Sequence, residues 1–141
     1  MTELPAFRSA VRRRRCLVPA DGWYEWAPRP DGAGRQPTYL TPLSGDVVAF
    51  AGLYEIWGPD RMLTSSIVTT AANAVLAPIH DRMPVILDSA AYDRWLDPGQ
   101  AKAEELLRPC PDEWLEAFPV STQVNNVRND VAELIAPMNP A

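Results

Sequence analysis

The sequence predicts an α+β domain built on a mainly antiparallel sheet, with short helices on one side. Two observations predict this fold class. Fifteen prolines and seven glycines are spread over 141 residues, which favours short strands and turns over long helices. Strand-forming β-branched and aromatic residues dominate the first two thirds, whereas segments with good helix propensity lie in the last third. Because no repeat or low-complexity linker interrupts the chain, we expect one domain over 1–141.

The first two thirds should supply the strands. DVVAFAGLYEIW is the strongest strand signal, and PRPDGAGRQP is a loop by composition. The expected elements are a strand at 16–18, a turn at 19–22, a strand at 23–26, a loop at 28–37, a hairpin formed by 38–43 and 46–57, a strand at 63–70, a short helix at 73–78 and a strand at 83–87.

The last third should supply the helices. Ser89 is a suitable N-cap for AAYDRWL, with a stop at 97–99. PDEWLEAF begins with proline and two acids, which is typical of a helix N-terminus. The expected elements are helices at 89–96, 100–108 and 111–118, a last strand at 120–124 and a short helix at 130–135.

Bulk composition excludes several classes of protein. A hydrophobic fraction of 47% with 22% charged residues is typical of a globular domain. No apolar run reaches the length of a membrane span, and the first residues carry no signal-peptide core, so we expect a cytoplasmic protein. Cys16 and Cys110 are expected to be reduced packing residues. With one histidine and no CxxC or HExxH, neither a metal nor a cofactor is expected.

The net charge of −5 is unevenly distributed. Residues 1–40 carry seven arginines against four acids, whereas residues 41–141 carry six basic residues against fourteen acids. The acidic whole argues against broad, non-specific DNA binding. We interpret the four arginines at 12–15 as a solvated charge run beside a strand, although such a patch leaves a local phosphate site open.

Glu25 and His80 are the first candidates for chemistry. Glu25 lies in DGWYEW, where desolvation by aromatic neighbours would raise its pKa and suit it to proton transfer; alternation could instead place it on the wet face of a strand. His80, in APIHDRMPV, suits general acid–base work but also fits a structural role. Arg82 could grip a phosphate or pair with Asp81 or another acid.

Hydroxyl and aromatic side chains offer further contacts with nucleic acid. Thr69 and Thr70 belong to a run of small hydroxyls that could donate hydrogen bonds to phosphates, or could be ordinary strand residues. The five tryptophans could stack on exposed bases, or could be core and rim residues.

Taken together, four motifs resemble the SRAP (SOS response-associated peptidase) family. RRRCLVPADGWYEW, VAFAGLYEIW, TTAANAVLAPIHDRMPVIL and NNVRNDVAELIAP occur here in the family's order and cover nearly the whole chain. The resemblance implies a barrel-like antiparallel sheet and a protein that binds single-stranded DNA and captures abasic sites. It places Glu25 and His80 at active-site positions, and Arg82 and Thr69 along the phosphate path.

The resemblance also implies a covalent mechanism. In the family, the α-amine of an N-terminal cysteine forms a Schiff base with the ring-opened sugar, and its thiol then closes a thiazolidine. An α-amine has a pKa near 8, so a useful share is nucleophilic at neutral pH. The glutamate moves protons during ring opening and removal of the initiator Met, which is the source of the peptidase label. The histidine assists the Schiff-base steps and crosslink reversal.

This sequence departs from the family at its beginning. It opens with Met1-Thr2-Glu3-Leu4-Pro5 in place of a Met-Cys-Gly-like start, and the family's asparagine motif is missing. We therefore expect a partial SRAP domain, produced either by a miscalled start or by a genuine truncation, that is marginally stable and inactive alone. The alternatives are a non-catalytic remnant that binds single-stranded DNA and a fragment without function.

Overall fold

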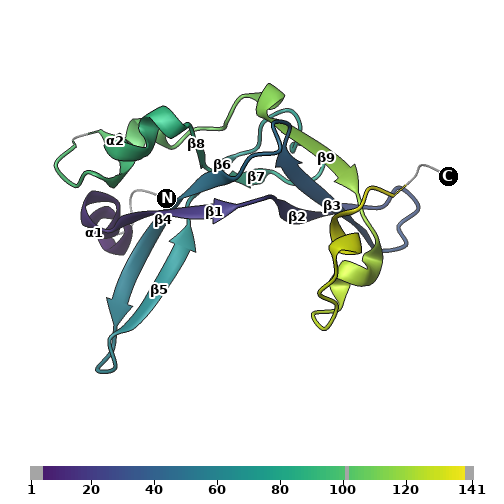
Figure 1. Cartoon of the computed structure of the whole chain (residues 1–141), viewed down its shortest axis with the longest axis horizontal. Coiled ribbons are helices and arrows are strands. Elements are labelled where there is room, and N and C mark those ends of the chain that lie inside the picture. The colour runs from purple at the N-terminus through teal and green to yellow at the C-terminus, as the bar shows by residue number, and fades with distance from the viewer. Residues whose placement is uncertain (1–4, 101, 139–141) are drawn as a thin grey trace. The chain divides into compact units, whose positions relative to one another are not determined.

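A computed structural model describes residues 5–100 and 102–138, and Figure 1 shows the course of the chain. The chain forms two compact units, each assembled from three separate stretches of sequence. Unit 1 comprises residues 1–20, 48–71 and 83–110, and unit 2 comprises residues 21–47, 72–82 and 111–141. Each unit is described by itself.

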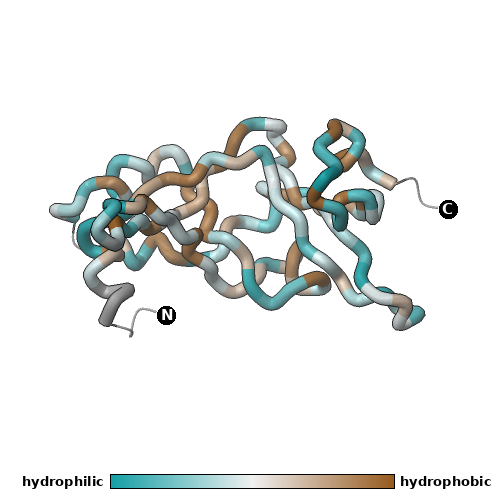
Figure 2. Tube along the Cα trace, turned by 90° about the horizontal axis from the view of Figure 1, so that it is seen from below, coloured by the Kyte–Doolittle hydropathy of each residue, from teal (hydrophilic) through white to brown (hydrophobic). Residues whose placement is uncertain are grey.

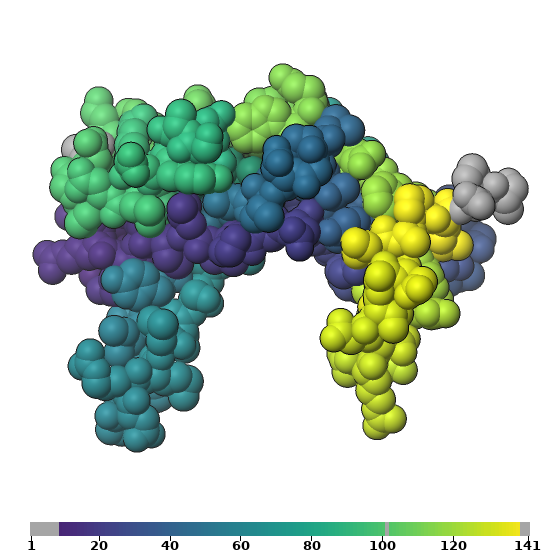
Figure 3. Space-filling model, in the orientation of Figure 1, coloured from purple at the N-terminus to yellow at the C-terminus, as the bar shows by residue number. Residues whose placement is uncertain are grey.

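Unit 1 contains a four-stranded antiparallel sheet. In it β4 pairs with three neighbours, because its ten residues are long enough to hold β1 and β8 at one end and β5 along the other. The strands are β1 (Arg15–Ala20), β4 (Val48–Trp57), β5 (Met62–Ile67) and β8 (Ile86–Leu87). The register of β1 with β4 ends at Leu53, so the outer part of the β4–β5 hairpin projects beyond β1 as an arm (Figure 3).

Helix α1 (Pro5–Arg13) covers part of this sheet, and the sequence analysis did not predict it. Its Ala10 and Val11 are buried in a core cluster with Trp95 of α2 (Tyr92–Leu96). The helix begins at a proline and ends at two arginines, both favourable positions for those residues. The expected solvated run at 12–15 was wrong for one member, because Arg15 is 8% exposed.

Unit 2 contains a three-stranded antiparallel sheet in which β3 is central. The strands are β2 (Trp23–Pro28), β3 (Arg35–Pro42) and β9 (Leu115–Pro119). The core of this unit includes Leu40, Leu76 and Val120, all fully buried. β6 (Thr69–Ala71) and β7 (Arg82–Pro84) form a separate two-stranded sheet, at which the chain leaves and re-enters unit 1.

The α+β class with mainly antiparallel sheets is confirmed, but two details differ from the prediction. The described strands form three sheets rather than one barrel-like sheet. The segments 38–43 and 46–57 do not pair with each other: β3 pairs with β2 and β9, whereas β4 pairs with β1, β5 and β8. The loop between β2 and β3, not the short turn after β3, therefore closes the hairpin.

The predicted helices of the last third are mostly short 3₁₀ turns. The expected helix at 111–118 is one turn at Asp112–Trp114 followed by β9, because pairing with the edge of β3 outweighs the local helix signal. The expected strand at 120–124 is a turn at Thr122–Asn125 capped by Ser121. Asp88, rather than Ser89, caps the segment before α2.

Two further segments that were expected to be helices are also turns. The segment 100–108 contains only a 3₁₀ turn at Ala103–Leu106, with Ala101 outside the described residues, and a final turn spans Ala132–Ile135. The segment 73–78 forms hydrogen-bonded turns rather than a helix. Figure 2 shows short hydrophobic and hydrophilic stretches mixed along the whole trace. No helix in the described part of the chain is both long and apolar enough to cross a membrane.

Candidate active site

Glu25 lies on β2, on the face opposite to an aromatic cluster. Strand alternation places Tyr24 and Trp26 on one face, where Tyr24 contacts Tyr39 of β3 with ring centroids 5.2 Å apart. Glu25 and Trp23 share the other face, and Glu25 is registered against the buried Thr38. The two residues that flank Glu25 in sequence are therefore not the ones that surround its carboxyl group.

The surroundings of Glu25 favour a protonated carboxyl. Its side chain is half-buried, and this desolvation raises its pKa above the ordinary value. Two weaker influences act in the opposite direction: the charge of His80 and the polar side chain of Trp23 both lower the pKa of Glu25. The residues of β2 from Trp23 to Ala27 are all half-buried, so Glu25 lies on a face that is neither fully wet nor fully covered, and its role in proton transfer stays a prediction.

A compact turn before β7 positions His80. The buried Asn73 starts this turn, and its side-chain oxygen accepts a hydrogen bond from the backbone N–H of Leu76 at 3.2 Å. The carbonyl of Leu76 in turn accepts from the backbone N–H of His80 at 2.9 Å. The Asp112 carboxylate accepts a hydrogen bond from the backbone N–H of Ala74 at 2.9 Å, and this bond connects the turn to the segment before β9. Since Leu76 is fully buried, the turn that carries His80 is anchored in the core of unit 2.

The imidazole of His80 is held through one of its two nitrogens. Nδ1 lies 3.0 Å from both the backbone nitrogen and the carbonyl oxygen of Arg82, and 3.4 Å from an oxygen of Asp81. In the neutral ring, Nδ1 can accept the N–H of Arg82, which places the proton on Nε2. In the charged ring, Nδ1 can donate to the Arg82 carbonyl. The backbone of Arg82 thus supports either protonation state and leaves Nε2 available for chemistry.

The structure brings together three of the five predicted site residues. Glu25, His80 and Arg82 belong to unit 2, and Arg82 is half-buried at the start of β7. Thr69 and Thr70 are half-buried on β6 in unit 1. Their contacts with DNA stay a prediction. In the described ranges 5–100 and 102–138, no group of three or more His, Cys, Asp or Glu side chains has an arrangement that could hold a metal ion.

Sequence reasoning missed the residues that support this pair. Trp23 helps to set the pKa of Glu25, Asn73 organises the turn that carries His80, and Asp112 ties that turn to the chain before β9. Only Asn73 had a usable signal, since asparagine favours turns through its own backbone. The tether from Asp112 joins distant parts of the sequence, so no local pattern announces it.

A half-buried carboxylate coupled to an imidazole, both set against an antiparallel sheet, defines a candidate general acid–base site. Residues 1–127 match the family described as SOS response associated peptidase (SRAP). The protein belongs to the SRAP family, which confirms the resemblance drawn from its sequence.

Relatives with descriptive names are found in bacteria and vertebrates. The chain is 40% identical to the abasic site processing protein YoaM of Bacillus subtilis over 141 residues, which cover 96% of this chain and 62% of the relative. It is 33% identical to the abasic site processing protein HMCES of Gallus gallus over 152 residues, which cover 91% of this chain and 45% of the relative. The chain therefore spans less than two thirds of the length of these relatives.

Solved structures share the fold. A crystal structure of a protein from Bacteroides thetaiotaomicron superposes with a TM-score of 0.86 at 30% identity, over 98% of this chain and 62% of that one. A second, from Bordetella bronchiseptica, gives a TM-score of 0.73 at 27% identity, over 85% of this chain and 61% of that one.

Proposed function

We propose that this chain carries the acid–base part of an abasic-site processing protein, which captures ring-opened deoxyribose in single-stranded DNA. The electrostatic interaction between Glu25 and His80 is the observation that carries this proposal. Names of the relatives support the substrate, and the desolvated carboxyl supports a proton-transfer role near neutral pH.

The two side chains have complementary roles in the proposed reaction. A protonated Glu25 donates to the ring oxygen of the baseless sugar while the C1 hydroxyl loses its proton to water, so that the bond between C1 and the ring oxygen breaks and C1 becomes an aldehyde. A primary amine then adds to the aldehyde carbon, and loss of one water leaves a Schiff base. We assign to His80 the proton transfers that release this water, and their reversal when the adduct is hydrolysed. The same carboxyl would serve removal of the initiator Met, which accounts for the peptidase part of the family's description.

Neither internal thiol suits the covalent step that follows in the proposed scheme. Thiazolidine closure needs an amine and a thiol on the same residue, and Cys16 and Cys110 carry no free α-amine within the chain. Burial raises the pKa of the Cys16 thiol, and Cys110 is 5% exposed. The proposal therefore requires an N-terminal amine as the nucleophile and assigns both cysteines to packing.

The sequence allows a sharp test, because Lys102 is its one lysine. Primary amines are then limited to Lys102 and the N-terminus, and cyanoborohydride converts any Schiff base into a stable adduct. A fluorescent single strand with one abasic site would be incubated with the chain and reductant, and adducts would be counted on a denaturing gel. The chain was expected to be inactive alone because it cannot close a thiazolidine, but its N-terminal amine can still form a Schiff base that the reductant traps. We therefore expect an adduct that persists in Lys102→Arg and falls by about 100-fold or more in rate in Glu25→Gln and His80→Ala.

Glu116→Gln is the matched control, since Glu116 is an exposed strand acid in the same sheet as Glu25. It should trap the strand at the wild-type rate, and an intact strand should give no adduct. Equal rates for Glu25→Gln and Glu116→Gln would refute the assignment of Glu25. An adduct that disappears in Lys102→Arg would show that the lysine, not the N-terminus, is the nucleophile.

A further inference from the structure

Unit 1 contains a cleft of about 520 Å³ that the acid–base pair does not involve. It lies between the end of α1 and the segment that follows α2. Its polar lining includes Arg12, Arg13, Arg15, Gln100, Lys102 and Glu104. The lining therefore carries four positively charged side chains and one carboxylate, although the net charge of the whole protein is −5.

Arg15 contributes a fixed positive charge to this cleft. Its side chain donates to the carbonyl of Val11 at 2.6 Å and to the carbonyls of Trp95 and Asp97, and it lies over the Trp95 ring at 5.4 Å. Burial lowers the pKa of Arg15, and the Asp97 charge acts in the opposite direction. An arginine stays protonated in proteins, so the guanidinium is a buried cation held mainly by carbonyl dipoles.

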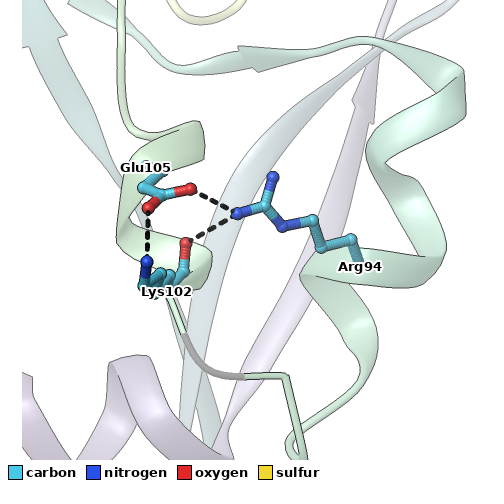
Figure 4. Close-up of polar contacts among 3 residues, drawn as sticks. All are labelled: Arg94, Lys102 and Glu105. Carbon is cyan, nitrogen blue, oxygen red and sulfur yellow. Dashed lines mark hydrogen bonds and ion pairs between the residues drawn. The ribbon is translucent and has the colours of Figure 1, made fainter.

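A small polar network fixes the opposite rim of the cleft (Figure 4). Arg94 donates to the carbonyl of Lys102 at 3.1 Å and to the Glu105 carboxylate at 2.7 Å. The ammonium of Lys102 lies 3.8 Å from the other oxygen of Glu105. One carboxylate is thus shared by two cations, and Glu104 balances the remaining charge, so the positive charge of the cleft comes mainly from the arginines at the end of α1. Lys102 has a left-handed backbone conformation, with φ of 68°.

Arg12 and Arg13 supply the accessible charge. Both are exposed, and neither makes an ion pair among the residues that the structure describes. Successive residues of a helix point about 100° apart, so the two guanidiniums approach the cleft from different directions. Such an arrangement suits neighbouring phosphates along a chain better than a single small anion.

We propose that this cleft binds the phosphate backbone of single-stranded nucleic acid, as a contact separate from the acid–base pair. Arginine and lysine supply most phosphate contacts in such complexes, and a local basic cleft allows them in a protein that is acidic as a whole. The proposal rests on the proposed function only for the choice of a single strand as ligand. Affinity for an undamaged strand tests it, whereas adduct formation tests the acid–base pair.

Fluorescence anisotropy with an undamaged labelled strand provides the experiment. Arg12→Gln/Arg13→Gln would be compared with Arg61→Gln/Arg108→Gln, which removes two exposed arginines of the same unit outside the cleft. Each phosphate contact contributes about 0.7 to the slope of log K against log salt for single strands. Loss of two contacts should lower the slope by about 1.4, so that raising salt from about 50 to about 200 mM weakens the cleft variant roughly sevenfold less than the wild type.

Lys102→Gln tests the opposite rim, with an expected change in slope of about 0.7. Equal slopes for the two double variants would overturn the proposal. The proposal would also be overturned if Arg12→Gln/Arg13→Gln bound the strand as tightly as the wild type but melted at a lower temperature. The two arginines would then only stabilise the end of α1. Pyrophosphate should compete only weakly with the strand for the cleft. Displacement of the strand by an equal concentration of pyrophosphate would identify a small-anion site and would also overturn the proposal.

Discussion

Gly22, which precedes β2, permits the close approach of β3 on which the Glu25 register depends. A Cβ atom at Gly22 would lie 2.3 Å from the carbonyl oxygen of Leu40 and 2.6 Å from the Tyr39 ring. Ordinary contact begins near 3.4 Å, so Gly22→Ala requires a shift of about 1.1 Å between the two strands. The clash involves backbone, which cannot move aside as a flexible side chain can.

The shift has two measurable consequences. Overpacking of this kind costs about 1–3 kcal/mol in the free energy of unfolding, or roughly 4–12 °C in melting temperature for a chain of this size. A displacement of about 1 Å at a reacting group can also lower a rate by about 100-fold. Because Glu25 follows on the same strand, Gly22→Ala should slow adduct formation with abasic DNA more than its stability loss alone explains.

Thermal unfolding would be followed by circular dichroism. The gel assay for adducts would use the same preparation, at a temperature where the variant is folded. Gly99→Ala is the control for stability, since a Cβ there would meet only the Asp97 carboxylate at 3.2 Å. It should melt within about 3 °C of the wild type. A Gly22→Ala variant that melts and reacts like the wild type would refute the argument from strand spacing.

Three further predictions concern other residues. Burial raises the pKa of Glu25 above its ordinary 4.5, so the folded chain prefers the protonated carboxyl and its free energy of unfolding should fall as pH rises from 4.5 through the folded-state pKa. Denaturant unfolding between pH 4 and 8 should show this fall in the wild type, and its persistence in Glu25→Gln would count against a buried carboxyl. Asn73→Ala leaves the N–H of Leu76 without its acceptor, so it should lower the free energy of unfolding by about 1–3 kcal/mol and shift the His80 ring signals in NMR spectra. Asn73→Asp keeps the acceptor and should recover part of this loss. Equal stability of the two variants would contradict the reasoning. Arg15→Lys replaces the planar guanidinium by a compact ammonium, which cannot reach carbonyls that are contacted from three different nitrogens, and should cost about 2–3 kcal/mol in denaturant unfolding. A loss below about 0.5 kcal/mol would show that these contacts add little.

Strands with strong local signals were predicted well. VAFAGLYEIW forms β4 over most of its expected range, and WYEW lies within β2. β-Branched and aromatic side chains favour a pleated surface wherever the strand pairs, so their positions are visible in sequence. Which strands pair is a different matter, since pairing depends on distant segments. The expected hairpin between 38–43 and 46–57 failed for this reason.

The failures in the last third have a similar cause. PDEWLEAF has the local signature of a helix start, yet Leu115–Pro119 joins the sheet because β3 offers an edge with unpaired backbone groups. Helix α1 was not predicted, although it begins at Pro5. Its apolar face is short, because only Ala10 and Val11 among its residues belong to the buried core cluster.

The candidate site was only partly visible in the sequence. Spacing alone left Glu25 and His80 open to ordinary structural roles, and family resemblance suggested their partnership. The pattern DGWYEW correctly indicated that burial raises the pKa of Glu25, although Tyr24 and Trp26 lie on the opposite face of β2 from Glu25. Sequence alternation defines the two faces of a strand without revealing which one is covered.

The most direct measurement of the central claim is an NMR titration of the Glu25 side-chain carboxyl carbon, in the wild type and in His80→Ala. The charge of His80 lowers the pKa of Glu25 and burial raises it. The Glu25 carboxyl should therefore titrate above its ordinary 4.5 in the wild type, and higher still once the imidazole is removed. A Glu25 that titrates at its ordinary value, and does so equally in both proteins, would contradict a shared acid–base site.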